Sequence, residues 1–253
     1  MDNSSLILAE VEHPAWLSKT YLVGEGDGGA AVLIDSGGPA EPLLAAIRDH
    51  HLRVTYLLNT HHHGDHIAEN DRLRRETGAR LCAHRLDAPA IAGVDQQLED
   101  GDWIETGSLR VRALHIPGHT AGQLAFVVND RICFTADTLF KGSIGGTVAS
   151  GHTTFADLRH SIMQKLMALP EAMQVAPGHA GLTTIGEERE RNPFVRVMRG
   201  LDPEGSARAR YAGRQVRLIV WARDYDGGFK AWVRFDDGSD AVVPGSRVER
   251  LAG

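Results

Sequence analysis

The segment from Asn59 to His66 reads Asn-Thr-His-His-His-Gly-Asp-His and constrains this chain more than any other. It contains four His and one Asp, and four of these side chains are candidate metal ligands, namely His61, His63, Asp65 and His66. Residues 54–58, directly before it, are apolar and β-branched at their start, which predicts a buried strand. The segment is therefore a loop leaving a strand end, where alternate side chains can turn toward one point. His62 alternates away from its neighbours, so we expect it to be exposed or to support a ligand.

Three later strand ends carry residues of the same types. A predicted strand over 109–114 leads to a Pro-Gly turn that presents His119. Asp137 follows a predicted strand over 131–134, and His179 follows another strand and a second Pro-Gly turn. Each feature is weak alone. Four strand ends that all deliver ligand types indicate a metal centre.

Seven candidate ligands fit two adjacent divalent cations, with one carboxylate between them. The first set is His61, His63 and His119, the second is Asp65, His66 and His179, and the bridge is Asp137. Nitrogen and carboxylate ligands without thiolate suit Zn²⁺, with Fe²⁺ or Mn²⁺ as alternatives. Cations about 3.5–4 Å apart can share a hydroxide and polarise one carbonyl oxygen. Asp65 would also orient the nucleophile, which gives it a catalytic role.

The pattern of elements around these loops predicts an α/β fold, because strands alternate with helices of amphipathic spacing. Strands are expected over 6–11, 20–23, 30–35, 54–58 and 80–83, with helices over 40–50 and 70–77. Asp35 ends one of these strands beside a Gly-rich loop. It is expected either to support a metal ligand or to cap a turn.

The ordered set His-x-His-x-Asp-His, Gly-His, Asp and Gly-His resembles the metallo-β-lactamase superfamily over about residues 6–200. This resemblance implies an αββα sandwich with the metals at one edge of two sheets. Residues 134–145 and 177–194 are similar to the glyoxalase II-like branch, whose best-known substrate is S-lactoylglutathione. That branch implies a dinuclear metal-dependent hydrolase of small thioesters, in which a metal-bridging hydroxide attacks the acyl carbonyl.

Departures from the family patterns keep other activities open. The β-lactamases usually carry Cys or Ser where Asp137 stands, so β-lactamase activity is not expected. Glyoxalase II has a basic residue that helps hold glutathione where this chain has Gly146, so the thiol carrier is left open. The related persulfide dioxygenases use one iron held by two His and one Asp, matching His61 or His63 with His119 and Asp137. A mononuclear iron persulfide dioxygenase, or a lactone or other ester hydrolase of the superfamily, is therefore the alternative. Lys141 is expected either to contact a substrate carboxylate or to be a solvated surface lysine.

The tail differs in kind from the rest of the chain. Residues 201–209 resemble a linker, and strands are expected over 215–223, 229–236 and 240–243 with Gly-containing hairpin turns between them. We predict a catalytic domain over 1–204 and an independent SH3- or Tudor-like antiparallel β-barrel over 205–253. Three of its aromatic side chains could form a binding face, but core or dimer packing is expected for them; they are Trp221, Tyr225 and Trp232.

Composition excludes several classes of partner. The formal net charge of −6 argues against nucleic acid, and no apolar run is long enough to cross a membrane. The first residues lack the basic and apolar pattern of a secretory signal. Cys82 and Cys133 cannot build a disulfide framework, which suits a cytoplasmic location, and both are expected to fill small apolar sites. We expect a small-molecule substrate, and a homodimer is left open.

Overall fold

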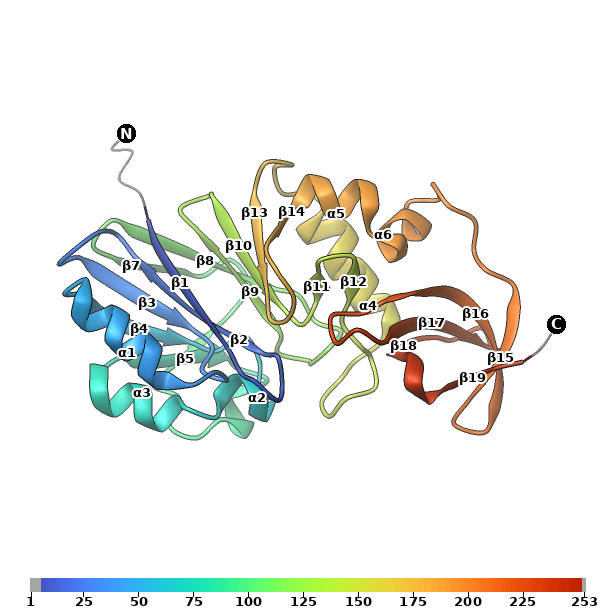
Figure 1. Ribbon diagram of the computed structural model, residues 1–253, viewed down its shortest axis with the longest axis horizontal. Coiled ribbons are helices and arrows are strands. Elements are labelled where there is room, and N and C mark those ends of the chain that lie inside the picture. Colours follow the sequence, from blue (N-terminus) through green and yellow to red (C-terminus); the bar gives the residue numbers. More distant parts are fainter. Residues whose placement is uncertain (1–5, 252–253) are drawn as a thin grey trace. The chain divides into compact units, whose positions relative to one another are not determined.

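The computed structural model describes residues 6–251 (Figure 1). The chain divides into two compact units, Met1–His115 with Gly122–Phe134, and Ile116–Ala121 with Thr135–Gly253. The C-terminal strands belong to the second unit. The predicted domain boundary between residues 204 and 205 stays a prediction.

The first unit contains a six-stranded sheet in the order β1-β2-β3-β4-β5-β6. Its strands are β1 Ile7–Glu12, β2 Lys19–Gly24, β3 Ala30–Ile34, β4 Arg53–Leu58, β5 Arg80–His84 and β6 Gln96–Leu98. Strands β1 to β3 pair antiparallel, whereas β3 to β6 pair parallel. The carboxyl ends of β3, β4 and β5 therefore meet at one edge of the sheet. This edge receives Asp35 and the histidine-rich loop.

Parallel neighbours require crossover connections, which helices supply here. They are α1 Ala40–Asp49 between β3 and β4, the single turn α2 Gly64–Ile67, and α3 Asn70–Thr77 before β5. Helices α1 and α3 cover one face of the sheet (Figure 1). Leu43 and Leu73 of these helices are fully buried against Leu33 and Leu57. Gly78 ends α3 with φ 73°, the left-handed conformation that glycine adopts at little cost.

A second set of strands in the first unit pairs antiparallel and in sequence. The strands are β7 Trp103–Thr106, β8 Leu109–His115, β9 Leu124–Val128 and β10 Ile132–Ala136, the last two residues of which belong to the second unit. Tyr21 of β2 contacts Phe134 of β10 edge to face at 5.1 Å, and Thr55 of β4 hydrogen-bonds Thr106 of β7 at 3.0 Å. The two sheets of this unit therefore share one core. A short 3-10 turn, Ala88–Ala90, follows β5.

After residue 135, the second unit contains short elements whose loops carry predicted ligands. They are β11 Leu139–Phe140, β12 Ser143–Ile144, α4 Phe155–His160 continuing as a π-helix Ser161–Leu166, β13 Gln174–Pro177, β14 Thr183–Thr184, α5 Ile185–Arg191 and α6 Pro193–Met198. Thr154 and Asp157 form a reciprocal capping box at the start of α4. Asn192 caps α6, whose first residue is Pro193.

The C-terminal sheet of the second unit is antiparallel throughout, in the order β18-β17-β16-β15-β19. Its elements are β15 Ala207–Tyr211, β16 Arg214–Arg223, β17 Phe229–Phe235, β18 Asp240–Pro244, the 3-10 turn Gly245–Arg247 and β19 Val248–Arg250. The predicted linker over 201–209 is wrong for its last residues, which begin β15. In β15, exposed arginines at 208 and 210 alternate with the buried Ala209. The sequence was mistaken for a linker because these exposed positions make the strand polar.

Both cysteines are buried and free. Burial raises the pKa of the Cys82 and Cys133 thiols to about 12, which keeps them protonated and unreactive. This agrees with the prediction that each fills a small apolar site. Within residues 6–251, every helix is too short or too polar to cross a bilayer.

Candidate metal centre

The histidine-rich loop leaves the carboxyl end of β4, as predicted. A buried amide pair fixes it: Asn70 Nδ2 donates to Asn59 Oδ1 at 2.8 Å, and Ser36 Oγ donates to Asn70 Oδ1 at 2.6 Å. Gly37 brings the β3 loop so close that an added Cβ would lie 1.5 Å from the carbonyl oxygen of Asp65. These contacts fix the two loops against each other at one sheet edge. The positions of the predicted ligands on the histidine-rich loop are therefore defined by contacts within the protein.

Asp35 hydrogen-bonds a predicted ligand, which favours the first of its two expected roles. Its Oδ1 accepts from the Thr60 backbone N–H at 2.7 Å. Its Oδ2 accepts from Thr60 Oγ1 and from His66 Nδ1, both at 2.8 Å. A carboxylate that holds the proton on Nδ1 leaves the His66 Nε2 lone pair for a metal. Asp35 adopts φ 59°, a strained conformation that the surrounding hydrogen bonds maintain.

The same carboxylate sets the tautomer of His61 through Thr60. Because Thr60 Oγ1 donates to Asp35, it must accept from His61 Nδ1, which lies 3.0 Å away. The His61 Nε2 lone pair then lies 3.0 Å from His63 Nδ1. Two nitrogens bound to one cation at about 2.1 Å are about 3.0 Å apart at a right angle and about 3.4 Å apart at a tetrahedral angle. His61 and His63 are therefore spaced to share a cation.

Asp65 and His66 follow on the single turn α2. Asp65 Oδ2 lies 3.6 Å from His66 Nε2, beyond ordinary hydrogen-bond length but close to the separation of two ligands on one cation. The Asp65 side chain is 27% exposed, whereas that of His66 is fully buried. Asp65 is thus the residue of this pair that a solvent or substrate molecule can reach.

His62 does not join this set and instead binds Asp87. The His62 N–H and ring Nδ1 lie 3.1 and 2.9 Å from Asp87 Oδ2, and Gly122 N donates to Asp87 Oδ1 at 2.8 Å. His62 was expected to be exposed or to support a ligand, and it supports the loop. Asp87 was missed. Its only signal was its place just beyond β5, where an acidic residue before Ala-Pro looks like an ordinary turn.

The second unit brings His119, Asp137 and His179 together around one oxygen. Asp137 Oδ2 lies 3.4 Å from His119 Nε2 and 3.4 Å from His179 Nε2. His119 Nδ1 donates to the carbonyl oxygen of Gly146 at 2.9 Å, which leaves its Nε2 for a metal. Both separations match ligand pairs on a cation, and the shared oxygen matches a carboxylate that bridges two cations.

Backbone strain and close packing surround these predicted ligands. Ala136, before Asp137, has φ 42°, and Ala180, after His179, has φ 71°. Gly145 approaches so closely that an added Cβ would lie 1.7 Å from the carbonyl oxygen of Asp137. Strain concentrated beside functional side chains is typical of sites that hold a required geometry.

The His179 ring also contacts two aromatic rings. Tyr225, between β16 and β17, stacks on it with centroids 4.2 Å apart and 13° between planes. Phe140 meets it edge to face at 5.7 Å. Tyr225 was expected in core or dimer packing, and local sequence offers no signal that links the tail to His179. Lys141 is exposed in the turn between β11 and β12, and its substrate contact remains a proposal.

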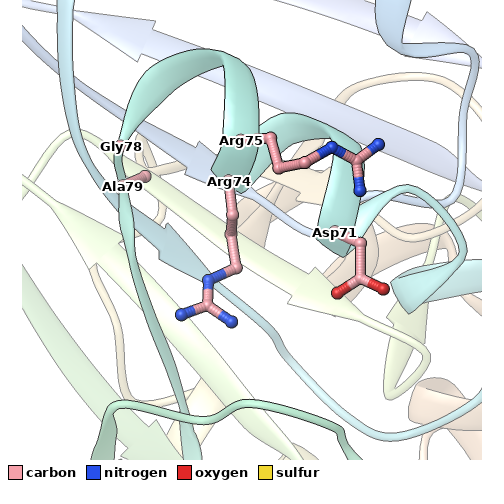
Figure 2. Close-up of a pocket in the computed structure, with 5 residues that line it drawn as sticks. All are labelled: Asp71, Arg74, Arg75, Gly78 and Ala79. Atoms are coloured by element: carbon pink, nitrogen blue, oxygen red, sulfur yellow. The ribbon is translucent and has the colours of Figure 1, made fainter.

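A separate hollow of about 370 Å³ lies at the end of α3 (Figure 2). It is lined by Asp71, Arg74, Arg75, Gly78 and Ala79. Figure 2 shows Arg74 turned away from Asp71 and Arg75, and Arg74 pairs with Asp95 at 2.7 Å. This hollow contains none of the predicted ligands, and nothing in it indicates a metal.

All seven predicted ligands belong to His and Asp groupings that could hold a metal ion. Imidazole nitrogens and carboxylates without thiolate fit divalent zinc, iron or manganese. A family model described as the metallo-beta-lactamase superfamily matches residues 14–179, a span that contains all seven. The chain belongs to this superfamily. The family and the α/β fold expected from the sequence are confirmed, with β-sheets flanked by helices and a curled C-terminal antiparallel sheet.

Relatives of this superfamily member include proteins with and without an assigned activity. An uncharacterized protein of Mycobacterium tuberculosis is 36% identical over 205 residues, which cover 69% of this chain and 91% of that protein. A hydroxyacylglutathione hydrolase of Rhodopseudomonas palustris is 40% identical over 161 residues, which cover 63% of this chain and 61% of the hydrolase. The superfamily and these relatives support a metal-dependent hydrolase.

Solved structures of similar fold come from several branches. BLEG-1, a B3 metallo-beta-lactamase, has a TM-score of 0.69 at 28% identity, with 75% of this chain and 99% of that one covered. ETHE1 from Myxococcus xanthus has a TM-score of 0.67 at 28% identity, with 78% and 91% covered. A protein solved in a di-iron-bound form has a TM-score of 0.63 at 31% identity, with 74% and 99% covered.

Proposed function

We propose that this chain is a dinuclear metal-dependent hydrolase of small thioesters. The observation that carries the proposal is the position of Asp137 Oδ2, which lies 3.4 Å from the Nε2 atoms of both His119 and His179. A single carboxylate oxygen between two imidazoles suits a bridge between two cations better than a hydrogen bond to either ring. The dinuclear site and its ligands form the core of the proposal.

The proposed ligand sets are those expected from the sequence. One cation would take His61, His63 and His119, and the other would take Asp65, His66 and His179, with Asp137 shared. Zinc is the proposed metal, with iron or manganese as alternatives. Two cations bound there would acidify a shared water and polarise the substrate carbonyl.

The chain's own residues prepare this chemistry in three ways. Asp35 and Thr60 hold the protons of His66 and His61 on their Nδ1 atoms, so the Nε2 lone pairs stay available without reorganisation. Asp65, partly exposed, would orient the attacking water through its carboxylate and accept its proton. A thiolate leaves without needing prior protonation, so the proposed reaction requires no general acid.

The proposed substrate is a small acyl thioester, by similarity to the hydroxyacylglutathione hydrolase of Rhodopseudomonas palustris. Lys141 would meet a carboxylate of that substrate from the β11–β12 turn. Gly146, where glyoxalase II carries a basic residue, uses its carbonyl to orient His119, so this position cannot supply a charge for glutathione. A thiol carrier other than glutathione is therefore included in the proposal.

A mononuclear iron persulfide dioxygenase is the second candidate. The pairing of His119 with Asp137 supports it, because two histidines and one carboxylate form the usual triad of non-haem iron oxygenases. His61 or His63 would complete that triad.

Elemental analysis of the purified protein, combined with a panel of thioesters of glutathione, coenzyme A and simple thiols, tests both candidates. Two metals per chain with hydrolysis of at least one thioester is the expected result. Two metals with no hydrolysis of any thioester would overturn the thioesterase assignment, and an ester and lactone panel would follow. One iron per chain with oxygen consumption on a persulfide would establish the second candidate.

A further inference from the structure

The C-terminal sheet reaches a predicted metal ligand through the hairpin that joins β16 to β17. Tyr225 lies in this hairpin, and its ring stacks on that of His179 at 4.2 Å with only 13° between the planes. The Tyr225 ring also meets Phe140 edge to face at 5.3 Å, and Phe140 meets His179. These three rings form one aromatic cluster in the second unit.

A buried polar network anchors the hairpin in this position. Ser143 Oγ donates to Asp224 Oδ1 at 2.9 Å, and Lys230 Nζ pairs with Asp224 Oδ2 at 2.9 Å. The Asp224 and Lys230 side chains are only 5% and 9% exposed. A buried ion pair has a large desolvation cost, so it stabilises little by itself, but it specifies one geometry because neither charge can move away from the other.

The network connects the tail to the segment that carries Asp137. Ser143 belongs to β12, six residues after Asp137 in the printed sequence, and Lys230 Nζ lies 5.8 Å from the ring centre of Phe140 and 5.5 Å from that of Tyr225. Thr147 and Val242 add a backbone hydrogen bond of 2.9 Å between this segment and β18. The hairpin is therefore fixed by the contacts of Asp224 and Lys230, and the neighbouring strand β18 is fixed by the hydrogen bond between Thr147 and Val242.

We propose that Tyr225 is a positioning residue for His179. The torsion about an imidazole Cβ–Cγ bond is broad, so ring contacts are needed to define the plane in which Nε2 lies. A parallel tyrosine ring on one face restricts that rotation and keeps Nε2 at 3.4 Å from Asp137 Oδ2. The inference rests on the proposed function only in taking His179 as a metal ligand. It makes the C-terminal sheet part of the metal centre.

Cobalt binding tests this proposal without any substrate. Metal-free wild-type protein and the variants Tyr225→Ala and Tyr225→Phe would be titrated with Co²⁺ alone, while the visible absorption reports the geometry at each cation. Loss of a group that orients a ligand typically weakens metal affinity about 10- to 100-fold. We expect such a loss for one of the two Co²⁺ equivalents in Tyr225→Ala, with an altered spectrum. Tyr225→Phe keeps the flat ring and should bind within about twofold of wild type.

Tyr211→Ala is the matched control. Tyr211 lies on β15 of the same sheet, is also half-buried, and contacts Phe235 edge to face at 6.3 Å. It should lower stability without changing Co²⁺ affinity. Equal Co²⁺ binding by Tyr225→Ala and wild type would overturn the proposal, as would equal losses in Tyr225→Ala and Tyr211→Ala. If Tyr225→Ala fails to fold, Tyr225→Leu retains apolar volume without the flat face and is judged by the same two criteria.

Turnover separates this inference from the proposed function. In an active enzyme, Tyr225→Ala at saturating metal should lower kcat more than it raises KM, because His179 would be displaced from the reacting centre. If no thioester is hydrolysed but the Co²⁺ readout changes, the thioesterase assignment fails and the positioning role stands. If thioesters are hydrolysed but Co²⁺ binding by Tyr225→Ala equals that of wild type, the thioesterase assignment stands and the positioning role fails.

Discussion

Asp35 and His66 form a buried carboxylate–imidazole pair, with Oδ2 and Nδ1 2.8 Å apart. Both side chains are almost completely enclosed, at 3% and 0% exposure. The same carboxylate also accepts two hydrogen bonds from Thr60, whose hydroxyl orients His61. One aspartate at the end of β3 therefore sets the tautomers of two predicted ligands at the end of β4.

Asp35→Asn tests this control of tautomers. The Asp35 carboxylate accepts three hydrogen bonds, from the Thr60 N–H, the Thr60 hydroxyl and His66 Nδ1. An asparagine amide has the same shape, but its NH₂ group cannot accept, so at least one of these bonds is lost. We expect metal affinity to fall about 10- to 100-fold, with the fold retained, as measured by competition with a chelator and by circular dichroism. Asp27→Asn is the control, since Asp27 pairs with His50 at 2.7 Å on the surface. Equal affinities in the two variants would contradict the assignment.

Asp137→Ala tests the bridging carboxylate. A bridge binds both cations and offsets their mutual repulsion, so we expect fewer than two metals per chain and loss of activity. Because Asp137 follows the end of β10, outside the hydrophobic cores, the fold should survive. Elemental analysis checks the metal content, with the exposed Asp49→Ala as control. Two retained metals and full activity would show that Asp137 does not bridge.

Gly145→Ala tests the close approach beside Asp137. An added Cβ would lie 1.7 Å from the Asp137 carbonyl oxygen, so the backbone carrying the ligand must shift. We expect a loss of about 1–3 kcal/mol in the free energy of unfolding, together with weaker metal binding. Denaturant unfolding and metal analysis measure the two effects. Gly181→Ala is the matched control, because its added Cβ would meet nothing within 4 Å. Similar behaviour of both variants would argue against a required close approach.

The buried His84 should make stability depend on pH. Burial, followed by the neighbouring His115 ring stacked at 4.1 Å, lowers the pKa of His84 from 6.5 to about 4. Leu86 N donates to His84 Nδ1, which favours the neutral ring. Between pH 6.5 and 4 the unfolded chain therefore binds more protons than the folded one. The contribution of neutral His84 is complete above pH 6.5 and is lost progressively down to pH 4.

The contribution of His84 to the free energy of unfolding is about 3.5 kcal/mol at most, since one pKa unit corresponds to about 1.4 kcal/mol. Denaturant unfolding of metal-loaded wild type and His84→Gln at pH 7.5, 6 and 5 measures it. Wild type should lose more stability than the variant between pH 7.5 and 5. Parallel losses would assign the pH dependence to other groups.

Local sequence carried enough information to predict a metal centre and its candidate ligands. A buried strand followed by a loop rich in His and Asp requires no distant partner to be recognised, and His119, Asp137 and His179 repeat that arrangement at later strand ends. Gly78 as a helix terminus and the Gly-containing turn between β16 and β17 also follow from local backbone preferences. These features depend on side-chain periodicity and on backbone conformations available to glycine, both of which are readable over a few residues.

The parts decided by tertiary structure involve residues that are distant in sequence. Asp35 could cap a turn or support a ligand until the parallel pairing of β3 with β4 placed it against Thr60 and His66. The hydrogen bond of Asp87 to His62 and the ring stack of Tyr225 on His179 were not predicted. Contacts between segments that are distant in the sequence produce no periodic pattern in it. Residue types and local pattern therefore determined which side chains could bind metal. Strand pairing and packing decided how those side chains are oriented, because ring planes and proton positions depend on neighbours that only the folded chain supplies.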